Sequence, residues 1–84
     1  MNKALLLIDI QNDYFPSGKM ELEGALEAAE NSARLLSVFR AAKQEIVHVQ
    51  HVATRSDAPF FLPGTVGVEI HRLVEPVAGE QVFT

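Results

Sequence analysis

A short apolar run near the start of the chain, interrupted by one carboxylate, constrains the fold more than any other feature. Residues 4–10 read ALLLIDI, without a helical period, and a turn-rich stretch follows them. Such a run is typical of a strand buried on both faces, as in a parallel sheet. Asp9 stands inside the run, although an ionised side chain is rarely buried without a partner.

Two interpretations of Asp9 follow from its place in the run. At the carboxyl end of a parallel strand, Asp9 would face the crevice in which open α/β sheets bind ligands, and partial burial there would tune its pKa for proton transfer. Alternatively, Asp9 closes the strand and accepts hydrogen bonds from nearby turn amides. The residues alone leave both open.

The rest of the chain predicts a helix and two further strands. Residues 24–43 place apolar side chains at helical spacing, with acidic residues toward the start and basic residues toward the end. Residues 45–52 alternate and are β-branched, so a βαβ crossover is the economical topology. Residues 53–67 are loop-like, residues 68–74 fit one or two helical turns, and residues 80–84 resemble a third strand. We therefore predict an α/β fold with about three strands and one long helix, half of a doubly wound sheet.

Composition limits the classes of partner. The 84 residues suffice for one small domain, and a net charge of -4, from 11 acidic and 7 basic residues, argues against nucleic-acid binding. No apolar stretch approaches the roughly 20 residues of a membrane span, and the first run is too short for a signal peptide. We expect a cytoplasmic protein without a membrane partner. The sequence has no cysteine, which excludes disulfides, a thiolate nucleophile and cysteine-ligated metal within these residues.

The segment ALLLIDIQNDYFPSGKMEL, residues 4–22, resembles the opening of the isochorismatase-like cysteine hydrolases. This superfamily includes nicotinamidases, carbamoylsarcosine amidases and ureidoacrylate amidases. The likeness continues through the helix, the strand IVHVQHV and the segment LPGTVGVEIHRLVEPVAGEQVFT, so it covers the whole chain in order. It implies a Rossmann-like, three-layer parallel sheet, of which this chain supplies the N-terminal half.

The resemblance also implies a catalytic set of an aspartate, a lysine and a cysteine. Asp9 matches the aspartate, the base that takes the thiol proton before the thiolate attacks an amide or similar carbon. Gln11 and Tyr14 match positions near the substrate pocket, and His51, at the end of the second strand, would line it. The family implies a small-molecule substrate, no cofactor, and a homo-oligomer when the protein is complete.

The chain departs from the family pattern in its catalytic set. The lysine is expected just after residues 80–84, and the cysteine further on, whereas Lys3, Lys19 and Lys43 do not match the family's position. We therefore interpret residues 1–84 as an incomplete isochorismatase-like hydrolase domain, truncated before the catalytic lysine and cysteine. Alone, this fragment is expected to be inactive and to associate through a sheet edge and uncovered apolar faces.

Other interpretations remain open beside this one. A non-catalytic α/β binding or assembly module is the main rival, and a flavodoxin-like receiver or nucleotide-binding unit is disfavoured because no Gly-rich loop follows the first strand. Phe60 to Leu62 could cap a substrate pocket, join a subunit interface or pack on the core. We expect no metal site, because His48 and His51 face opposite sides of a strand and the Asp-x-His pair of nicotinamidases is absent.

Overall fold

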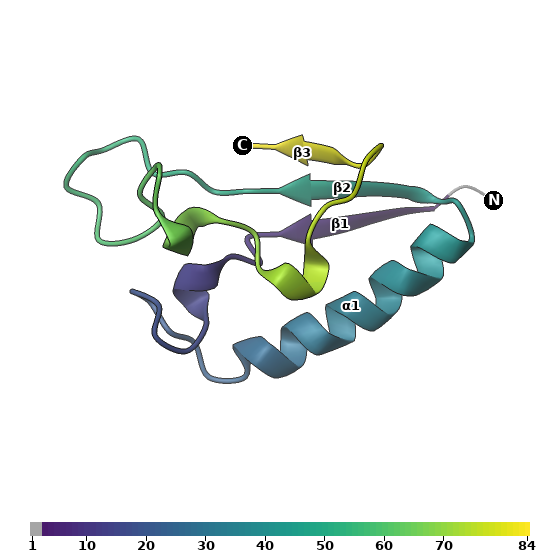
Figure 1. The fold of residues 1–84 in the computed structure, drawn as a ribbon, viewed down its shortest axis with the longest axis horizontal. Coiled ribbons are helices and arrows are strands. Elements are labelled where there is room, and N and C mark those ends of the chain that lie inside the picture. The colour runs from purple at the N-terminus through teal and green to yellow at the C-terminus, as the bar shows by residue number, and fades with distance from the viewer. Residues whose placement is uncertain (1–2) are drawn as a thin grey trace.

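The computed structural model describes residues 3–84, which form a parallel sheet with one long helix against it (Figure 1). The elements follow the order β1 (Ala4–Ile8), α1 (Ala25–Ala41), β2 (Glu45–Val49) and β3 (Gln81–Phe83). All three strands are parallel, in the order β1-β2-β3. The predicted βαβ unit and the third strand are confirmed, with shorter strands than the apolar pattern indicated.

The helix α1 begins after Gly24 and ends at Ala41. Gly24 has a φ of 80°, a left-handed conformation that costs glycine little because it has no Cβ. The buried residues Ala29 and Leu36 face the sheet, while Leu35 is 47% exposed on the outer side. The amphipathic stripe therefore lays α1 along one face of the sheet.

The core lies between α1 and that face. Its buried members come from β1, α1, β2 and the segment before β3: Leu5, Leu7, Leu36, Ile46 and Val74. The paired register places Leu5 beside Ile46 and Leu7 beside His48, so the inward residues of β1 and β2 lie side by side. Burial of these apolar side chains is the main favourable contribution to holding the helix on the sheet.

The prediction that the first strand is buried on both faces is wrong for residues 3–84. Burial alternates along β1, and Leu6 and Ile8 are 56% and 57% exposed. Phe83 of β3, which pairs with Val49 on the same side, is 55% exposed. The reason is that α1 and the turns before β3 cover only one face (Figure 1). An apolar run shows that a strand tolerates burial on both faces. Whether both faces are covered depends on the other elements, and residues 3–84 cover only one.

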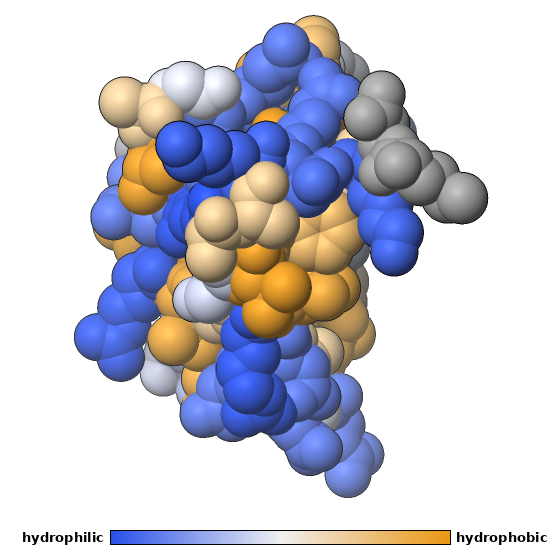
Figure 2. Space-filling model, turned by 90° about the vertical axis from the view of Figure 1, so that its right-hand side faces the viewer, coloured by the Kyte–Doolittle hydropathy of each residue, from blue (hydrophilic) through white to orange (hydrophobic). Residues whose placement is uncertain are grey.

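Three short 3₁₀ turns complete the fold: η1 (Asn12–Tyr14), η2 (Val66–Val68) and η3 (Arg72–Val74). The last two confirm the helical turns expected near residues 68–74, and residues 53–65 form the predicted loop. Figure 1 shows η1 and this loop beyond the carboxyl ends of the strands. Figure 2 views the opposite end of the molecule, where a small apolar area is bordered by hydrophilic residues.

Candidate functional site at the carboxyl edge of the sheet

Asp9 follows β1 directly, at the edge where all three strands end (Figure 1). Its main-chain N–H donates to the Val49 carbonyl at 2.9 Å, and its carbonyl accepts from the Gln11 N–H at 3.0 Å. Its φ is 59°, a left-handed conformation that is uncommon outside glycine, although aspartate adopts it more often than most residues. The half-buried side chain is therefore held by a well-defined backbone at the position where open α/β sheets present ligands.

Gln11 is fully buried and ties the ends of two strands together. Its Nε2 donates to the His51 carbonyl at 2.8 Å and to the Val68 carbonyl at 2.6 Å, and its Oε1 accepts from the His51 N–H at 2.8 Å. Because main-chain groups use both ends of the amide, Gln11 fixes the path of the chain after β2. Its expected contact with substrate stays a prediction.

Tyr14 and His51 belong to an aromatic cluster at the same end of the molecule. The Phe61 ring lies at its centre, with ring centroids 5.0 Å from Tyr14, 5.3 Å from His51 and 4.9 Å from Phe60. Such tilted and edge-on distances are favourable for aromatic pairs. Tyr14 is half-buried, whereas His51 is exposed and lines a shallow cavity of about 250 Å³ with residues 53–55, 58 and 59.

Asp13 is a buried carboxylate in the turn-rich stretch that follows β1. It is 3% exposed, and its carboxylate accepts from the Phe61 N–H at 2.7 Å and the Lys19 N–H at 3.1 Å. Gly67 packs directly against it, because a Cβ built on Gly67 would lie 2.1 Å from Asp13 Oδ1. Its contact with Phe61 spans 48 residues, so no local pattern could have revealed it.

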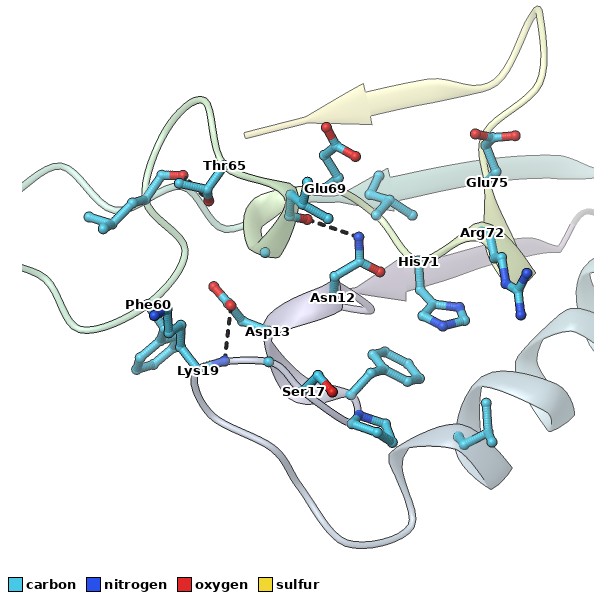
Figure 3. A pocket seen from close by; sticks show the side chains of 18 residues that line it. Asn12, Asp13, Ser17, Lys19, Phe60, Thr65, Glu69, His71, Arg72 and Glu75 are labelled. Atoms are coloured by element: carbon cyan, nitrogen blue, oxygen red, sulfur yellow. Dashed lines mark hydrogen bonds between the residues drawn. The ribbon is translucent and has the colours of Figure 1, made fainter.

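A larger cavity, of about 730 Å³, lies beside η1 (Figure 3). Asn12 and Asp13 line it, but Asp9, Gln11, Tyr14 and His51 do not. In its wall the His71 ring stacks on Phe15 with centroids 3.9 Å apart. Burial, followed by the charge of Arg72, lowers the pKa of His71. We place the candidate site at Asp9 rather than in this cavity, because Asp9 combines a carboxylate with the ligand-presenting edge of the sheet.

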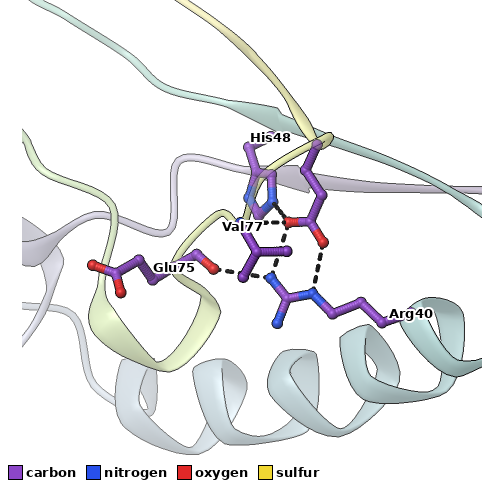
Figure 4. Close-up of polar contacts among 5 residues, drawn as sticks. Arg40, His48, Glu75 and Val77 are labelled. Carbon is purple, nitrogen blue, oxygen red and sulfur yellow. Dashed lines mark hydrogen bonds and ion pairs between the residues drawn. The ribbon is translucent and has the colours of Figure 1, made fainter.

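A second polar cluster lies at the opposite end of the strands and positions β3 (Figure 4). Arg40 of α1 donates to both oxygens of Glu80, at 2.6 and 2.9 Å, and His48 Nε2 lies 2.8 Å from Glu80 Oε1. Arg40 also reaches the Glu75 carbonyl at 2.9 Å. These hydrogen bonds, Arg40 first, lower the pKa of Glu80 to about 2 against the opposing effect of burial. The same carboxylate raises the pKa of Arg40.

His48 and His51 differ in burial, and only His48 belongs to β2. His48 is fully buried beneath α1, and His51 is exposed beyond the end of β2. Within residues 3–84, no group of three or more His, Cys, Asp or Glu side chains is placed to hold a metal ion. Over the same residues, no helix has the length and apolar character needed to cross a membrane.

Comparison with known proteins decides the family. The family model described as Isochorismatase domain matches residues 3–84. The chain belongs to the isochorismatase family. It is 54% identical over 83 residues to the isochorismatase family protein YddQ of Bacillus subtilis (strain 168), and 37% identical to the secreted isochorismatase effector Isc1 of Verticillium dahliae. The match takes in 99% of this chain in both cases, but 46% of YddQ and 43% of Isc1. The chain thus spans about half the length of these relatives.

Solved structures of isochorismatase relatives share the fold. An isochorismatase-family protein of Oleispira antarctica is 50% identical with a TM-score of 0.89, over 94% of this chain and 43% of that one. The N-carbamoylsarcosine amidase of Thermoplasma acidophilum has a TM-score of 0.86 over 98% of this chain and 50% of its own, at 22% identity, so it supports the fold alone. The predicted fold, the N-terminal half of an isochorismatase-like hydrolase, is confirmed.

Proposed function

We propose that this chain is the N-terminal part of a cysteine hydrolase that acts on a small amide-like substrate, with Asp9 as its general base. The observation that carries the proposal is the position of Asp9, held in a left-handed conformation at the carboxyl edge of a parallel sheet in an isochorismatase-family chain. Backbone strain of this kind gathers at functional sites. Tyr14 and His51 flank the same edge and are proposed to contact the substrate.

The chemistry needs a thiol and a lysine, and residues 1–84 contain no cysteine. Among the described residues, Lys3 directly precedes β1 and Lys43 precedes β2, so both are at the amino end of the sheet, and Lys19 lies in the turn region between η1 and α1. The cysteine and the catalytic lysine are therefore proposed to lie outside residues 1–84. These 84 residues alone would lack thiol-dependent activity.

In the proposed reaction Asp9 takes the proton of the cysteine thiol, and the thiolate attacks the amide carbon. The C–N bond breaks, the amine leaves with a proton, and the acyl group stays on sulfur. Water then attacks the thioester carbon, so that the carboxylic acid is released and the thiol is restored. The lysine would favour the thiolate by its positive charge. Homo-oligomeric assembly and a cytoplasmic location belong to the same proposal as predictions.

The test uses the full-length protein and two variants, Asp9→Asn and Asp57→Asn. Asp57 is a matched control because it is an exposed loop aspartate. Ammonia release is measured over a panel of small carboxamides and N-carbamoyl amino acids, and thiol reactivity is measured by alkylation with iodoacetamide near neutral pH. Asp9→Asn is expected to lower kcat by about 10²- to 10⁴-fold, the usual range for loss of a general base, and to slow alkylation. Full activity in Asp9→Asn with an unchanged circular dichroism spectrum would exclude Asp9 from the mechanism.

A non-catalytic α/β binding or assembly module is the second candidate, and the absence of cysteine from residues 1–84 favours it. The coding sequence distinguishes the two. A hydrolase requires a lysine codon shortly after residue 84 and a cysteine codon further on, before a helical stretch. A coding sequence without them would support the binding module.

A further inference from the structure

We propose that Asp13 is a positioning residue of the candidate site, because its buried carboxylate holds Phe61 in a left-handed backbone conformation. Asp13 thereby fixes the aromatic wall, defined as Tyr14, His51, Phe60 and Phe61, beside the Asp9 edge. The wall's role in substrate binding rests on the proposed function, whereas the link from Asp13 to Phe61 does not.

The backbone of Phe61 is in an unusual left-handed conformation. Its φ is 60°, which for a bulky side chain is an outlier that persists only where neighbouring groups enforce it. Two hydrogen bonds do so: the Phe61 N–H donates to Asp13 Oδ2 at 2.7 Å, and its carbonyl accepts from the Ala53 N–H at 2.9 Å. A hydrogen bond to a carboxylate is stronger than one to a neutral acceptor, so Asp13 is the firmer of the two restraints.

The surroundings of Asp13 are built around a carboxylate of this size. One oxygen serves Phe61 and the other accepts from the Lys19 N–H at 3.1 Å, so both face main-chain donors. Gly67 closes the remaining side, where a Cβ would lie 2.1 to 2.5 Å from the carboxylate atoms. An asparagine would have to turn its NH₂ toward one of the two N–H donors, and glutamate would be too long. Asparagine is therefore nearly isosteric but cannot satisfy both donors.

Phe61 passes this restraint on to the candidate site. Phe61 is 1% exposed, and its ring centroid lies 5.0 Å from that of Tyr14 and 5.3 Å from that of His51. Gln11 fixes the main chain of His51 independently, through two hydrogen bonds of 2.8 Å. The wall is thus held at two positions: Gln11 fixes the main chain of His51, and Asp13 fixes that of Phe61. The Asp13 carboxylate is buried and accepts from the main-chain N–H groups of Phe61 and Lys19, so we infer that it acts through Phe61.

The experiment compares full-length wild-type protein with Asp13→Asn, and uses Asp57→Asn as the exposed control. Amide NMR spectra follow the Phe61 N–H, and the ring resonances of Tyr14 report on the wall. Asp13→Asn is expected to shift the Phe61 amide proton upfield, speed its hydrogen exchange and shift the ring resonances of Tyr14. Asp57→Asn is expected to change none of them. An unchanged Phe61 amide in folded Asp13→Asn would overturn the proposal.

Kinetics then separate positioning from a purely structural role. With the panel compound that turns over fastest, Asp13→Asn is expected to raise KM at least about tenfold, the effect of losing about 1.4 kcal/mol of binding, with kcat and the alkylation rate changed less than twofold. An equal fall in kcat with KM constant would contradict it. If Asp9→Asn leaves alkylation and turnover intact, the proposed function fails, while the amide readout still decides the Asp13 link.

A wild-type measurement covers the case in which Asp13→Asn does not fold. Hydrogen exchange of the Phe61 and Lys19 amides, which share the Asp13 carboxylate, is compared with that of Ser56 in the exposed part of the loop. Strong protection at both Phe61 and Lys19 is the expected result. Exchange at Phe61 as fast as at Ser56 would show that Asp13 does not hold this backbone and would overturn the proposal.

Discussion

Replacing Glu80 with glutamine should weaken the attachment of β3 to α1. The Glu80 side chain is 8% exposed, and its two oxygens accept from Arg40, while Val77 donates its N–H to Oε1 at 3.2 Å. His48, completely buried, lies 2.8 Å from the same oxygen. A glutamine keeps one acceptor and adds an NH₂ that faces other donors. The substitution therefore leaves the Arg40 charge without its carboxylate and removes the anionic partner of His48.

The magnitude follows from the pKa of Glu80. Its pKa falls from 4.5 to about 2 in the folded protein, mainly through the Arg40 hydrogen bonds. Each factor of ten in proton affinity corresponds to about 1.4 kcal/mol, so the carboxylate contributes roughly 3 kcal/mol when ionised. The Arg40 side chain is 33% exposed, and solvent screening weakens its share. We expect Glu80→Gln to lower the free energy of unfolding at pH 7 by about 2 to 3 kcal/mol.

The contribution of Glu80 to the free energy of unfolding should decrease at low pH. Because folding lowers the pKa of Glu80, its contribution is fully present above the unfolded value of 4.5 and disappears as the pH falls toward 2. Urea unfolding of wild type and Glu80→Gln, followed by circular dichroism from pH 7 to pH 2.5, measures the difference. That difference should shrink through this window. Glu21→Gln is the control, since Glu21 is exposed, and it should stay within about 0.5 kcal/mol of wild type at pH 7.

Two results would refute the reasoning about Glu80. A loss below about 0.5 kcal/mol at pH 7 would mean that the Arg40 contact behaves as an ordinary surface ion pair. A loss that stays constant from pH 7 to pH 2.5 would show that glutamine disturbs packing rather than charge. Arg40→Met is a useful companion variant, because it keeps much of the aliphatic stem and removes the charge that lowers the pKa of Glu80.

Two further predictions compare buried with exposed positions, one on α1 and one on β1. Leu36→Ala, at 1% exposure in the core, should cost about 2 to 5 kcal/mol of unfolding free energy, while Leu35→Ala, at 47% exposure on the same helix, should cost less than about 1 kcal/mol in urea unfolding. In the 84-residue chain, the double variant Leu6→Thr and Ile8→Thr should reduce light scattering from self-association, because both side chains are on the open face. Leu5→Thr, on the buried face, should instead lower the melting temperature.

The elements of the fold could be predicted from sequence because their signals are local. The apolar run before Asp9, the helical stripe and the alternation in residues 45–52 each depend on neighbouring residues alone. The prediction went wrong where a distant layer decides the outcome. Leu6 and Ile8 suit burial as well as Leu5 and Leu7 do, and only the position of α1 separates the two pairs. An apolar side chain can be buried, but whether it is buried depends on which other elements pack over it.

The candidate site was predictable in part for the same reason. Asp9 could be placed at the sheet edge because a strand's end is visible in the sequence, and the structure adds the left-handed φ that no residue pattern indicated. Asp13 was missed because aspartate after asparagine is ordinary turn chemistry, and its partner Phe61 lies 48 residues away. The tight approach of Gly67 to Asp13 is equally non-local. A glycine whose missing Cβ makes room for a distant carboxylate looks like any loop glycine.

Hydrogen bonds between distant segments hold the chain at both ends of the strands. The strands are 5, 5 and 3 residues long, so the segments beyond their ends depend on other contacts. Gln11 and Asp13 bind main-chain groups at the carboxyl edge, whereas Arg40 and Glu80 bind each other at the amino end. A buried polar group without a partner is costly. Breaking one of these hydrogen bonds therefore costs more free energy than its net contribution to folding. Within residues 3–84, the Gln11 and Asp13 links hold this edge through main-chain groups and do not involve the Asp9 carboxylate, as the proposed role of Asp9 as general base requires.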